Sequence, residues 1–128
     1  MGERIVVVED DQDIQYLLQD TLSRAGYTVE VLPNGDNLIN RAVSTPDLFL
    51  LDVNLPGING LELCRFLKLN AVTKNVPVIL VSAFPGLRSV APKYYADDSL
   101  EKPFNFKNLI NVISKHLGKQ KDVGMASA

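Results

Sequence analysis

This sequence of 128 residues has little cysteine and no long hydrophobic run. Its single cysteine, Cys64, excludes an internal disulfide bond and a zinc cluster held by several thiolates. The longest apolar runs have only the length of a strand, and the N-terminus has neither the basic start nor the long apolar segment of a secretory signal. We therefore expect no membrane span and a cytoplasmic location.

The chain also lacks a strong excess of charge of either sign. Thirteen basic residues stand against fifteen acidic ones, for a net charge of −2, and no basic stripe offers a surface for a phosphate backbone. We expect no direct binding of nucleic acid. Apolar residues make up 46% and charged residues 22%, which is typical of a globular protein, and the length suits one domain around a single core.

Apolar segments of strand length alternate with segments of helical periodicity. Several of the former are apolar throughout, as is typical of strands buried on both faces of a sheet. The predicted strands are Ile5–Val8, Thr28–Leu32, Leu48–Leu51, Val76–Val81 and Ser99–Glu101. Strand–helix alternation with short connections predicts an α/β fold with a doubly wound parallel sheet and right-handed crossovers.

The segments between the strands carry apolar stripes at helical spacing. Gly26 ends the first stripe and Pro46 follows the second, while Asn105 starts the fourth and Gly118 ends it. The four stripes consist of Ile14, Leu17, Leu18, Leu22 and Ala25; of Leu38, Ile39, Ala42 and Val43; of Leu61, Cys64 and Leu67; and of Phe106, Leu109, Ile110, Ile113 and Leu117. We interpret Cys64 as a core residue with no chemical role.

Polar side chains follow four of the predicted strands. Glu9 and Asp10 follow the first strand and Asp52 the third, while Ser82 and Lys102 follow the fourth and fifth. Ligands of open parallel sheets bind beyond the carboxyl ends of the strands, so we expect these side chains at one edge. Two carboxylates about 4 Å apart repel by about 4 kcal/mol at an effective dielectric constant of about 20. Mg²⁺, which prefers oxygen ligands, would offset that repulsion.

Each of these residues has a simpler explanation when it is taken alone. The acidic pair after the first strand could cap the following helix, which is the role we expect for Asp11 and Asp13. A serine at a strand end is often a turn residue, and an isolated lysine is a solvated charge. Polar residues at the other strand ends argue against a turn role for Asp52.

His116 lies in the last turn of the fourth stripe, where a cation suits the helix dipole.

The sequence resembles the receiver domain of bacterial two-component response regulators, in the single-domain form typical of chemotaxis regulators. The resemblance rests on the motifs "VVVEDD", "LLDVNLPGINGLEL", "PVILVSA" and "LEKPF". It implies a flavodoxin-like fold with five parallel strands, in which residues 1–118 form the receiver domain. In this family the Lys–Pro bond, here Lys102–Pro103, is commonly cis. We expect residues 119–128 to be a disordered tail.

The resemblance also implies a role in a phosphorelay. Asp52 would accept a phosphoryl group from the phosphohistidine of a sensor histidine kinase or phosphotransfer protein, or from a small phosphodonor. Lys102 and Ser82 would contact the new phosphate. The protein would catalyse only its own phosphorylation and dephosphorylation. The added charge would switch a surface that binds an unknown downstream protein or a second copy of the chain.

The resemblance also implies a Mg²⁺ cofactor. Asp10, Asp52 and the backbone carbonyl of Asn54 would hold the ion, and Glu9 would act through water. A haloacid-dehalogenase-type phosphatase also uses an aspartate at a strand end, but it has a second aspartate where this chain has Asn54. A flavin or nucleotide binder needs a phosphate-cradling loop where this chain has the anionic "EDDQD". The remaining alternative is a degenerate receiver that acts as a phosphorylation-independent protein-interaction module.

The segment from residue 84 to residue 99 departs from the family pattern. In a helix a proline costs about 3 kcal/mol and a glycine about 1 kcal/mol, so the breakers in this segment predict an irregular or shortened fourth helix. These breakers are Pro85, Gly86 and Pro92. Tyr95 stands where the family has glycine, and Ser99 where it has an aromatic residue. Tyr94 and Tyr95 either fill the space left by Ser99, which is the simpler expectation, or form an exposed anchor for a partner.

Overall fold

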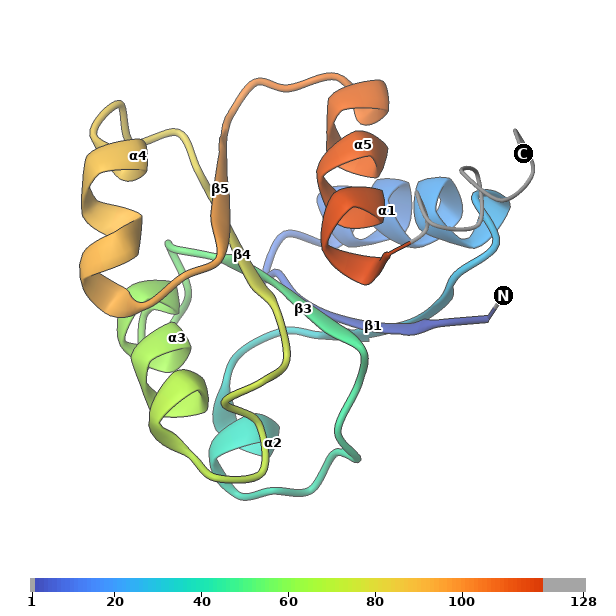
Figure 1. The fold of residues 1–128 in the computed structure, drawn as a ribbon. Coiled ribbons are helices and arrows are strands. Elements are labelled where there is room, and N and C mark those ends of the chain that lie inside the picture. The colour runs from blue at the N-terminus through green and yellow to red at the C-terminus, as the bar shows by residue number, and fades with distance from the viewer. Residues whose placement is uncertain (1, 119–128) are drawn as a thin grey trace.

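A five-stranded parallel sheet forms the centre of the molecule, with the strand order β2-β1-β3-β4-β5 (Figure 1). The structure, a computed structural model, describes residues 2–118, and the expected tail, residues 119–128, lies outside the described residues. The strands are β1 (Arg4–Val8), β2 (Thr28–Leu32), β3 (Leu48–Asp52), β4 (Val78–Ser82) and β5 (Asp98–Glu101). All four pairings are parallel, which confirms the predicted doubly wound sheet.

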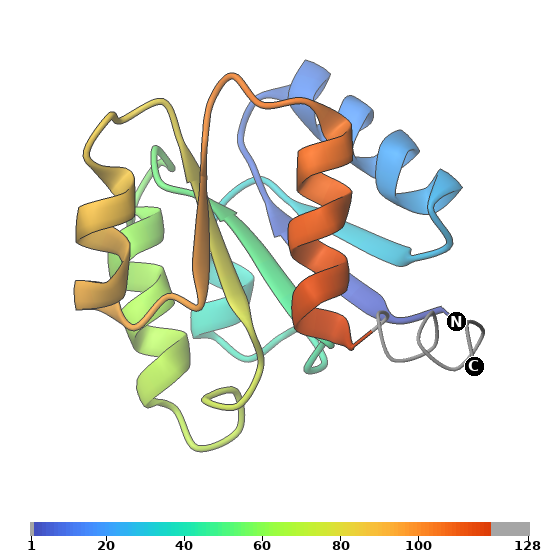
Figure 2. The same ribbon diagram turned by 45° about the horizontal axis from the view of Figure 1, so that its top comes forward.

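Helices cover both faces of this sheet (Figure 2). The core clusters place α1 and α5 on one face and α2, α3 and α4 on the other. The helices are α1 (Gln12–Arg24), α2 (Asp36–Ile39), α3 (Gly60–Leu69), α4 (Leu87–Val90) and α5 (Phe106–Leu117), with a 3₁₀ helix, η1 (Ala91–Tyr94), directly after α4. Among residues 2–118, no helix is long and apolar enough to cross a membrane.

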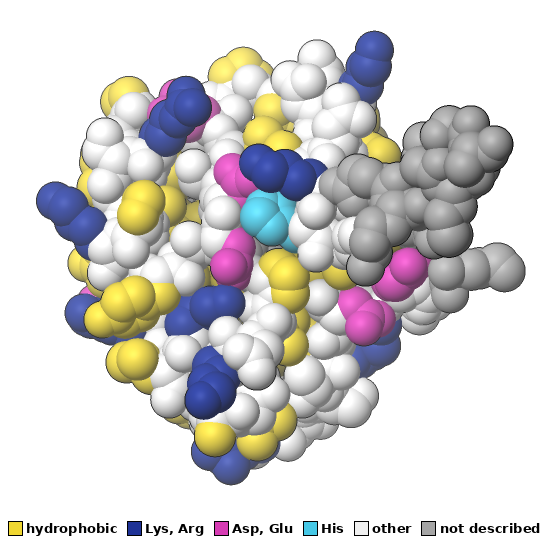
Figure 3. Space-filling view, viewed as in Figure 1, with side chains coloured by type: hydrophobic (Ala, Val, Ile, Leu, Met, Phe, Trp, Pro, Cys, Tyr) yellow, Lys and Arg dark blue, Asp and Glu magenta, His cyan; other side chains and the backbone are white. Residues whose placement is uncertain are grey.

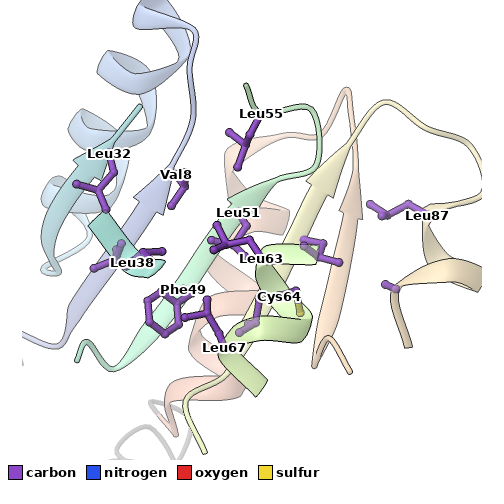
Figure 4. Packing of buried hydrophobic residues seen from close by; sticks show 14 residues of the cluster. Val8, Leu32, Leu38, Phe49, Leu51, Leu55, Leu63, Cys64, Leu67 and Leu87 are labelled. Atoms are coloured by element: carbon purple, nitrogen blue, oxygen red, sulfur yellow. The ribbon is translucent and has the colours of Figure 1, made fainter. Parts of the chain in front are cut away.

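Side chains of β1, β2, β3 and β4 alternate between two apolar clusters, one on each face of the sheet. In β1, Val6 and Val8 enter the cluster under α3, whereas Ile5 and Val7 enter the cluster under α1 and α5. Figure 4 shows the first cluster, in which Leu63 and Cys64 of α3 lie against the sheet. Burial on both faces explains why β1, β3 and β4 are apolar almost throughout.

The predicted helix ends are confirmed at three places. Asp11 caps α1, where its Oδ1 accepts hydrogen bonds from the amides of Asp13 (2.9 Å) and Ile14 (3.1 Å). Asn105 caps α5 through a 2.7 Å hydrogen bond from the amide of Asn108. Gly118 ends α5 with a φ of 72°, a backbone conformation that glycine adopts without strain.

Helix α2 is shorter than its apolar stripe predicted. It ends after Ile39, because Arg41 takes a left-handed conformation with a φ of 58°. The amide of Ala42 then donates to the carbonyl of Asn37 (2.8 Å), a hydrogen bond that closes the helix end. Val43 still packs against the core, but it does so from a loop.

The fourth helix is shortened, as predicted. Helix α4 has four residues and continues as the 3₁₀ helix η1, which ends at Tyr95 with a φ of 68°. The simpler expectation, that these tyrosines fill the space left by Ser99, is wrong for Tyr95, which is 52% exposed. Tyr94 packs against α3, where the Arg65 guanidinium lies 5.0 Å from its ring centroid. Cys64 is buried as expected, and its thiol donates to the carbonyl of Tyr94.

The start of α3 packs directly against the backbone of β3. The Gly60 amide donates to the carbonyl of Val53 (2.9 Å). A Cβ atom at position 60 would lie 2.1 Å from the carbonyl oxygen of Asp52, far inside van der Waals contact. Only glycine therefore allows α3 to approach the end of β3 this closely.

We predict that Gly60→Ala lowers the free energy of unfolding by about 2–3 kcal/mol, because backbone atoms must move apart to admit the methyl group. Urea denaturation of wild type and variant measures this difference. Gly57→Ala is the control, since a Cβ there meets nothing within 4 Å and only the φ of 75° adds strain, about 1 kcal/mol. A Gly60→Ala variant as stable as Gly57→Ala would contradict the close packing.

Candidate functional site

The polar side chains that follow the strands converge at the carboxyl edge of the sheet. One carboxylate oxygen from each of Glu9, Asp10 and Asp52 lies within 4.8 Å of the other two. The ammonium group of Lys102 lies 3.3 Å from Asp52 Oδ2 and 3.6 Å from Glu9 Oε1. Segments that are far apart in the sequence thus contribute three carboxylates and one ammonium group to a single cluster, as predicted.

Asp52 is held in place by backbone and side-chain contacts. The residue is 6% exposed, and its Oδ1 accepts a hydrogen bond from the amide of Asn54 (3.2 Å). The other oxygen, Oδ2, faces Lys102. The sheet pairing continues beyond Asp52, where the amide of Val53 donates to the carbonyl of Val81 (3.0 Å). This buried aspartate therefore has a fixed backbone and a polar partner at each carboxylate oxygen.

Glu9 is the most buried carboxylate of the cluster, with 3% of its surface exposed. Its amide extends the pairing of β1 with β2 by donating to the carbonyl of Leu32 (2.9 Å). Its Oε2 accepts a hydrogen bond from the amide of Asp11 (3.1 Å). These contacts direct Glu9 inward, whereas the next residue, Asp10, is exposed and its carboxylate has no hydrogen bond or ion pair with residues 2–118.

The cluster has more negative than positive charge. Burial raises the pKa of Glu9 from 4.5 to about 7, and the negative charge of Asp52 contributes to the rise. The hydrogen bond from Asp11 and the charge of Lys102 lower this pKa only in part. All the donor atoms offered by the three acidic residues are oxygens, so the cluster fits a hard divalent cation.

Ser82 lies at the end of β4, the strand next to the one that ends in Asp52. Its side chain is 1% exposed, and its Oγ accepts a hydrogen bond from the amide of Phe84 (3.1 Å). Its carbonyl accepts a hydrogen bond from the amide of Lys102 (2.9 Å), which joins the ends of β4 and β5. The Lys102–Pro103 bond that follows is cis, as the resemblance implied.

An apolar hollow lies beside Lys102, and the sequence did not predict it. It has a volume of about 340 Å³ and is lined by residues of α1, of the loops that follow β4 and β5, and of the start of α5. We call these residues the apolar surface: Ile14, Leu17, Leu18, Ala83, Pro103, Phe104 and Phe106, with the stem of Lys102. Leu17 and Phe106 belong to apolar stripes, yet they are 48% and 39% exposed.

A second charged cluster lies at the opposite end of β5. His116 Nε2 lies 2.9 Å and Lys115 Nζ 3.6 Å from Asp98 Oδ2, and Figure 3 shows the histidine next to acidic and basic side chains. Burial alone would raise the pKa of Asp98, but the hydrogen bonds from His116 and the Ser99 amide lower it below 3.8. His116 therefore bonds a specific carboxylate in addition to lying near a helix end.

A family model described as "Response regulator receiver domain" matches residues 5–114. Among curated relatives, the response regulator ArlR of Staphylococcus epidermidis is 35% identical over 121 residues, which cover 92% of this chain and 54% of the relative. The chain thus spans about half the length of the curated relatives that it matches.

Two solved structures carry information on metal binding. The response regulator TrrA of Thermotoga maritima, solved in complex with Mg²⁺–BeF, is 33% identical with a TM-score of 0.81, and the match covers 90% of this chain and 99% of TrrA. The receiver domain of the sensor histidine kinase PA1611 of Pseudomonas aeruginosa, solved with magnesium coordinated in the active-site cleft, is 26% identical with a TM-score of 0.83. That match covers 92% of this chain and 99% of the PA1611 receiver domain.

We predict that the metal-free protein loses stability as the pH rises towards 7. Because folding raises the pKa of Glu9 from 4.5 to about 7, the folded state keeps a proton at pH values where the unfolded state has lost it. The contribution of Glu9 to the free energy of unfolding therefore falls by about 2–3 kcal/mol between pH 4.5 and pH 8.

Urea denaturation at several pH values, in EDTA, measures this change as the difference between wild type and Glu9→Gln. The control is Glu101→Gln, which removes an exposed carboxylate and should follow the wild-type profile. The raised pKa would be contradicted if the free energies of unfolding of wild type and Glu9→Gln differed by the same amount at every pH. It would also be contradicted if the wild type became relatively more stable as the pH rises.

Proposed function

This chain belongs to the response regulator receiver domain family, and we propose that Asp52 is its phosphoacceptor in a two-component phosphorelay. The observation that carries the proposal is the buried Asp52 carboxylate, 3.3 Å from Lys102 Nζ and in one cluster with Glu9 and Asp10. We propose residues 1–118 as the extent of the receiver domain, because the family match and both core clusters lie within them.

The proposed reaction is transfer of a phosphoryl group to a carboxylate oxygen of Asp52. The bond between phosphorus and the histidine nitrogen of the donor breaks as the bond to Asp52 forms, and an acyl phosphate results. Lys102 neutralises charge on the transferred group from its position beside Asp52 Oδ2. Ser82 supplies a hydroxyl donor from the neighbouring strand end. The chain thus catalyses its own phosphorylation and, with water, its dephosphorylation.

Mg²⁺ is the cofactor that we propose for this site. The ligands would be carboxylate oxygens of Asp10 and Asp52 and the backbone carbonyl of Asn54, with Glu9 acting through water. Three lines of support are the oxygen-only donor set, the negative charges that Lys102 offsets only in part, and the magnesium in the TrrA and PA1611 structures. When bound, Mg²⁺ neutralises charge on the phosphoryl oxygens.

The proposed phosphodonor is the phosphohistidine of a sensor histidine kinase or phosphotransfer protein, in the cytoplasm. The apolar surface supports a docking role, because it includes Lys102 and therefore continues into the phosphorylation site. Its exposed members Leu17 and Phe106 would lose contact with water when an apolar helix of the donor covers them. A donor docked there brings its phosphohistidine to the carboxyl edge of the sheet.

The proposed output is a change in the loop that follows β4. The Ser82 hydroxyl accepts a hydrogen bond from the Phe84 amide, and a phosphoryl group on Asp52, with about two negative charges, would draw this hydroxyl towards itself. The loop leads into α4, so its movement would alter the surface that α4, η1 and β5 form. A downstream protein or a second copy of the chain would bind this surface.

We predict that Asp52→Asn abolishes phosphorylation, because the amide that replaces the carboxylate is not nucleophilic. The measurement is the intact mass after incubation with acetyl phosphate, with Mg²⁺ or with EDTA. The wild type should gain one phosphoryl group, and EDTA should slow this gain at least about tenfold. The control is Asp36→Asn, an exposed aspartate in α2, which should react like the wild type.

Modification of Asp52→Asn to the wild-type extent would overturn the assignment of the phosphoacceptor. Full modification of the wild type in EDTA would overturn the proposed cofactor. A wild type that gains no phosphoryl group from acetyl phosphate or from any sensor kinase would leave the degenerate receiver, a phosphorylation-independent interaction module, as the function of this chain.

A further inference from the structure

We propose that Gln15 is a positioning residue that sets the Mg²⁺ affinity of the carboxylate cluster by holding the peptide bond between Glu9 and Asp10. The side-chain amide of Gln15, on α1, donates a 2.5 Å hydrogen bond to the backbone carbonyl of Glu9. The inference rests on the proposed Mg²⁺ site, and it assigns to Gln15 no contact with the metal or with the phosphoryl group.

Gln15 fixes the loop between β1 and α1 at two points. Its backbone amide donates to the carbonyl of Asp11 (2.9 Å), and its side chain reaches back to the carbonyl of Glu9. On the other side, the amide of Glu9 is bonded to Leu32 of β2. The start of α1 and the edge of the sheet therefore hold the three-residue turn that carries two of the three carboxylates.

Asp10 is the residue for which this restraint matters most. Its exposed carboxylate forms no hydrogen bond or ion pair within the part of the chain that the structure describes, so its place depends on the backbone that carries it. The carbonyl of Glu9 and the amide of Asp10 belong to one rigid peptide plane. A donor that fixes this carbonyl therefore also limits where the Asp10 side chain can point.

Gln15 also restrains the side chain of Glu9, through hydrogen bonds within the same turn. Glu9 Oε2 accepts its hydrogen bond from the amide of Asp11, and the carbonyl of Asp11 in turn accepts from the amide of Gln15. Without the hydrogen bond from the Gln15 side chain, the Glu9 carbonyl would accept hydrogen bonds from water instead. The peptide plane would then be free to rotate. In the metal-free protein, the remaining repulsion between the carboxylates favours such rotation, because it increases their separation.

A purely structural role for Gln15 would appear as lower stability with unchanged metal affinity. The test therefore compares Gln15→Met, which keeps the length and helix propensity of the side chain but removes its donor, with Gln19→Met on the exposed part of the same helix. A second variant, Gln15→Asn, keeps the amide but is one methylene shorter, so it cannot span the distance to Glu9.

Two measurements on the full chain test whether Gln15 sets the Mg²⁺ affinity. Calorimetric titration with Mg²⁺ should give a dissociation constant about tenfold weaker for Gln15→Met and Gln15→Asn, and unchanged for Gln19→Met. Phosphorylation by acetyl phosphate should need about tenfold more Mg²⁺ for half-saturation in the Gln15 variants, while the rate at saturating Mg²⁺ stays within about twofold of wild type.

A third measurement is made on the metal-free protein. Hydrogen exchange at the Asp11 amide, which donates to Glu9, should be faster in Gln15→Met than in Gln19→Met. Equal Mg²⁺ affinity in Gln15→Met and Gln19→Met would overturn the proposal, whatever their exchange rates. If the wild type itself binds no Mg²⁺, the proposed metal site fails, and the exchange measurement alone then decides whether Gln15 holds the turn.

Discussion

Repulsion among the carboxylates of Glu9, Asp10 and Asp52 is the interaction on which the rest of this structure depends. Holding three carboxylates this close together costs free energy, and Lys102 supplies only part of the compensating charge. Burial is the main cause of the rise of the Glu9 pKa to about 7, and the negative charge of Asp52 adds to it. A parallel sheet whose strands are buried on both faces is stiff enough to hold these groups together.

The elements around the cluster fix backbone atoms more than side chains. Gly60 lets α3 approach the carbonyl of Asp52, and Asp11 caps α1 while its amide bonds Glu9. Gln15 adds the bond to the Glu9 carbonyl. In contrast, the Asp10 carboxylate forms no hydrogen bond or ion pair within residues 2–118. The chain thus has a site whose backbone is preorganised and whose outer carboxylate is free to bind a cation.

Strand positions and the residues that end the strands could be predicted from the sequence, because both follow from local composition. An unbroken apolar run such as that of β4 is characteristic of a doubly buried strand, and Asn105 and Gly118 end α5 through local hydrogen bonds and φ values. The features that the sequence did not predict depend on backbone conformations that are rare for the residue, or on packing between segments that are far apart in the chain. Arg41 ends α2 in a left-handed conformation that arginine rarely adopts, and Leu17 belongs to an apolar stripe but faces outward.

A crystal structure of the protein with Mg²⁺ and beryllofluoride, a mimic of the phosphoryl group, tests most directly whether Asp52 is the phosphoacceptor beside a metal site. We expect beryllofluoride on a carboxylate oxygen of Asp52, in contact with Lys102 and Ser82. We also expect Mg²⁺ bound by Asp10, Asp52 and the backbone carbonyl of Asn54. Beryllofluoride on another residue, or Mg²⁺ bound away from the three carboxylates, would contradict these assignments.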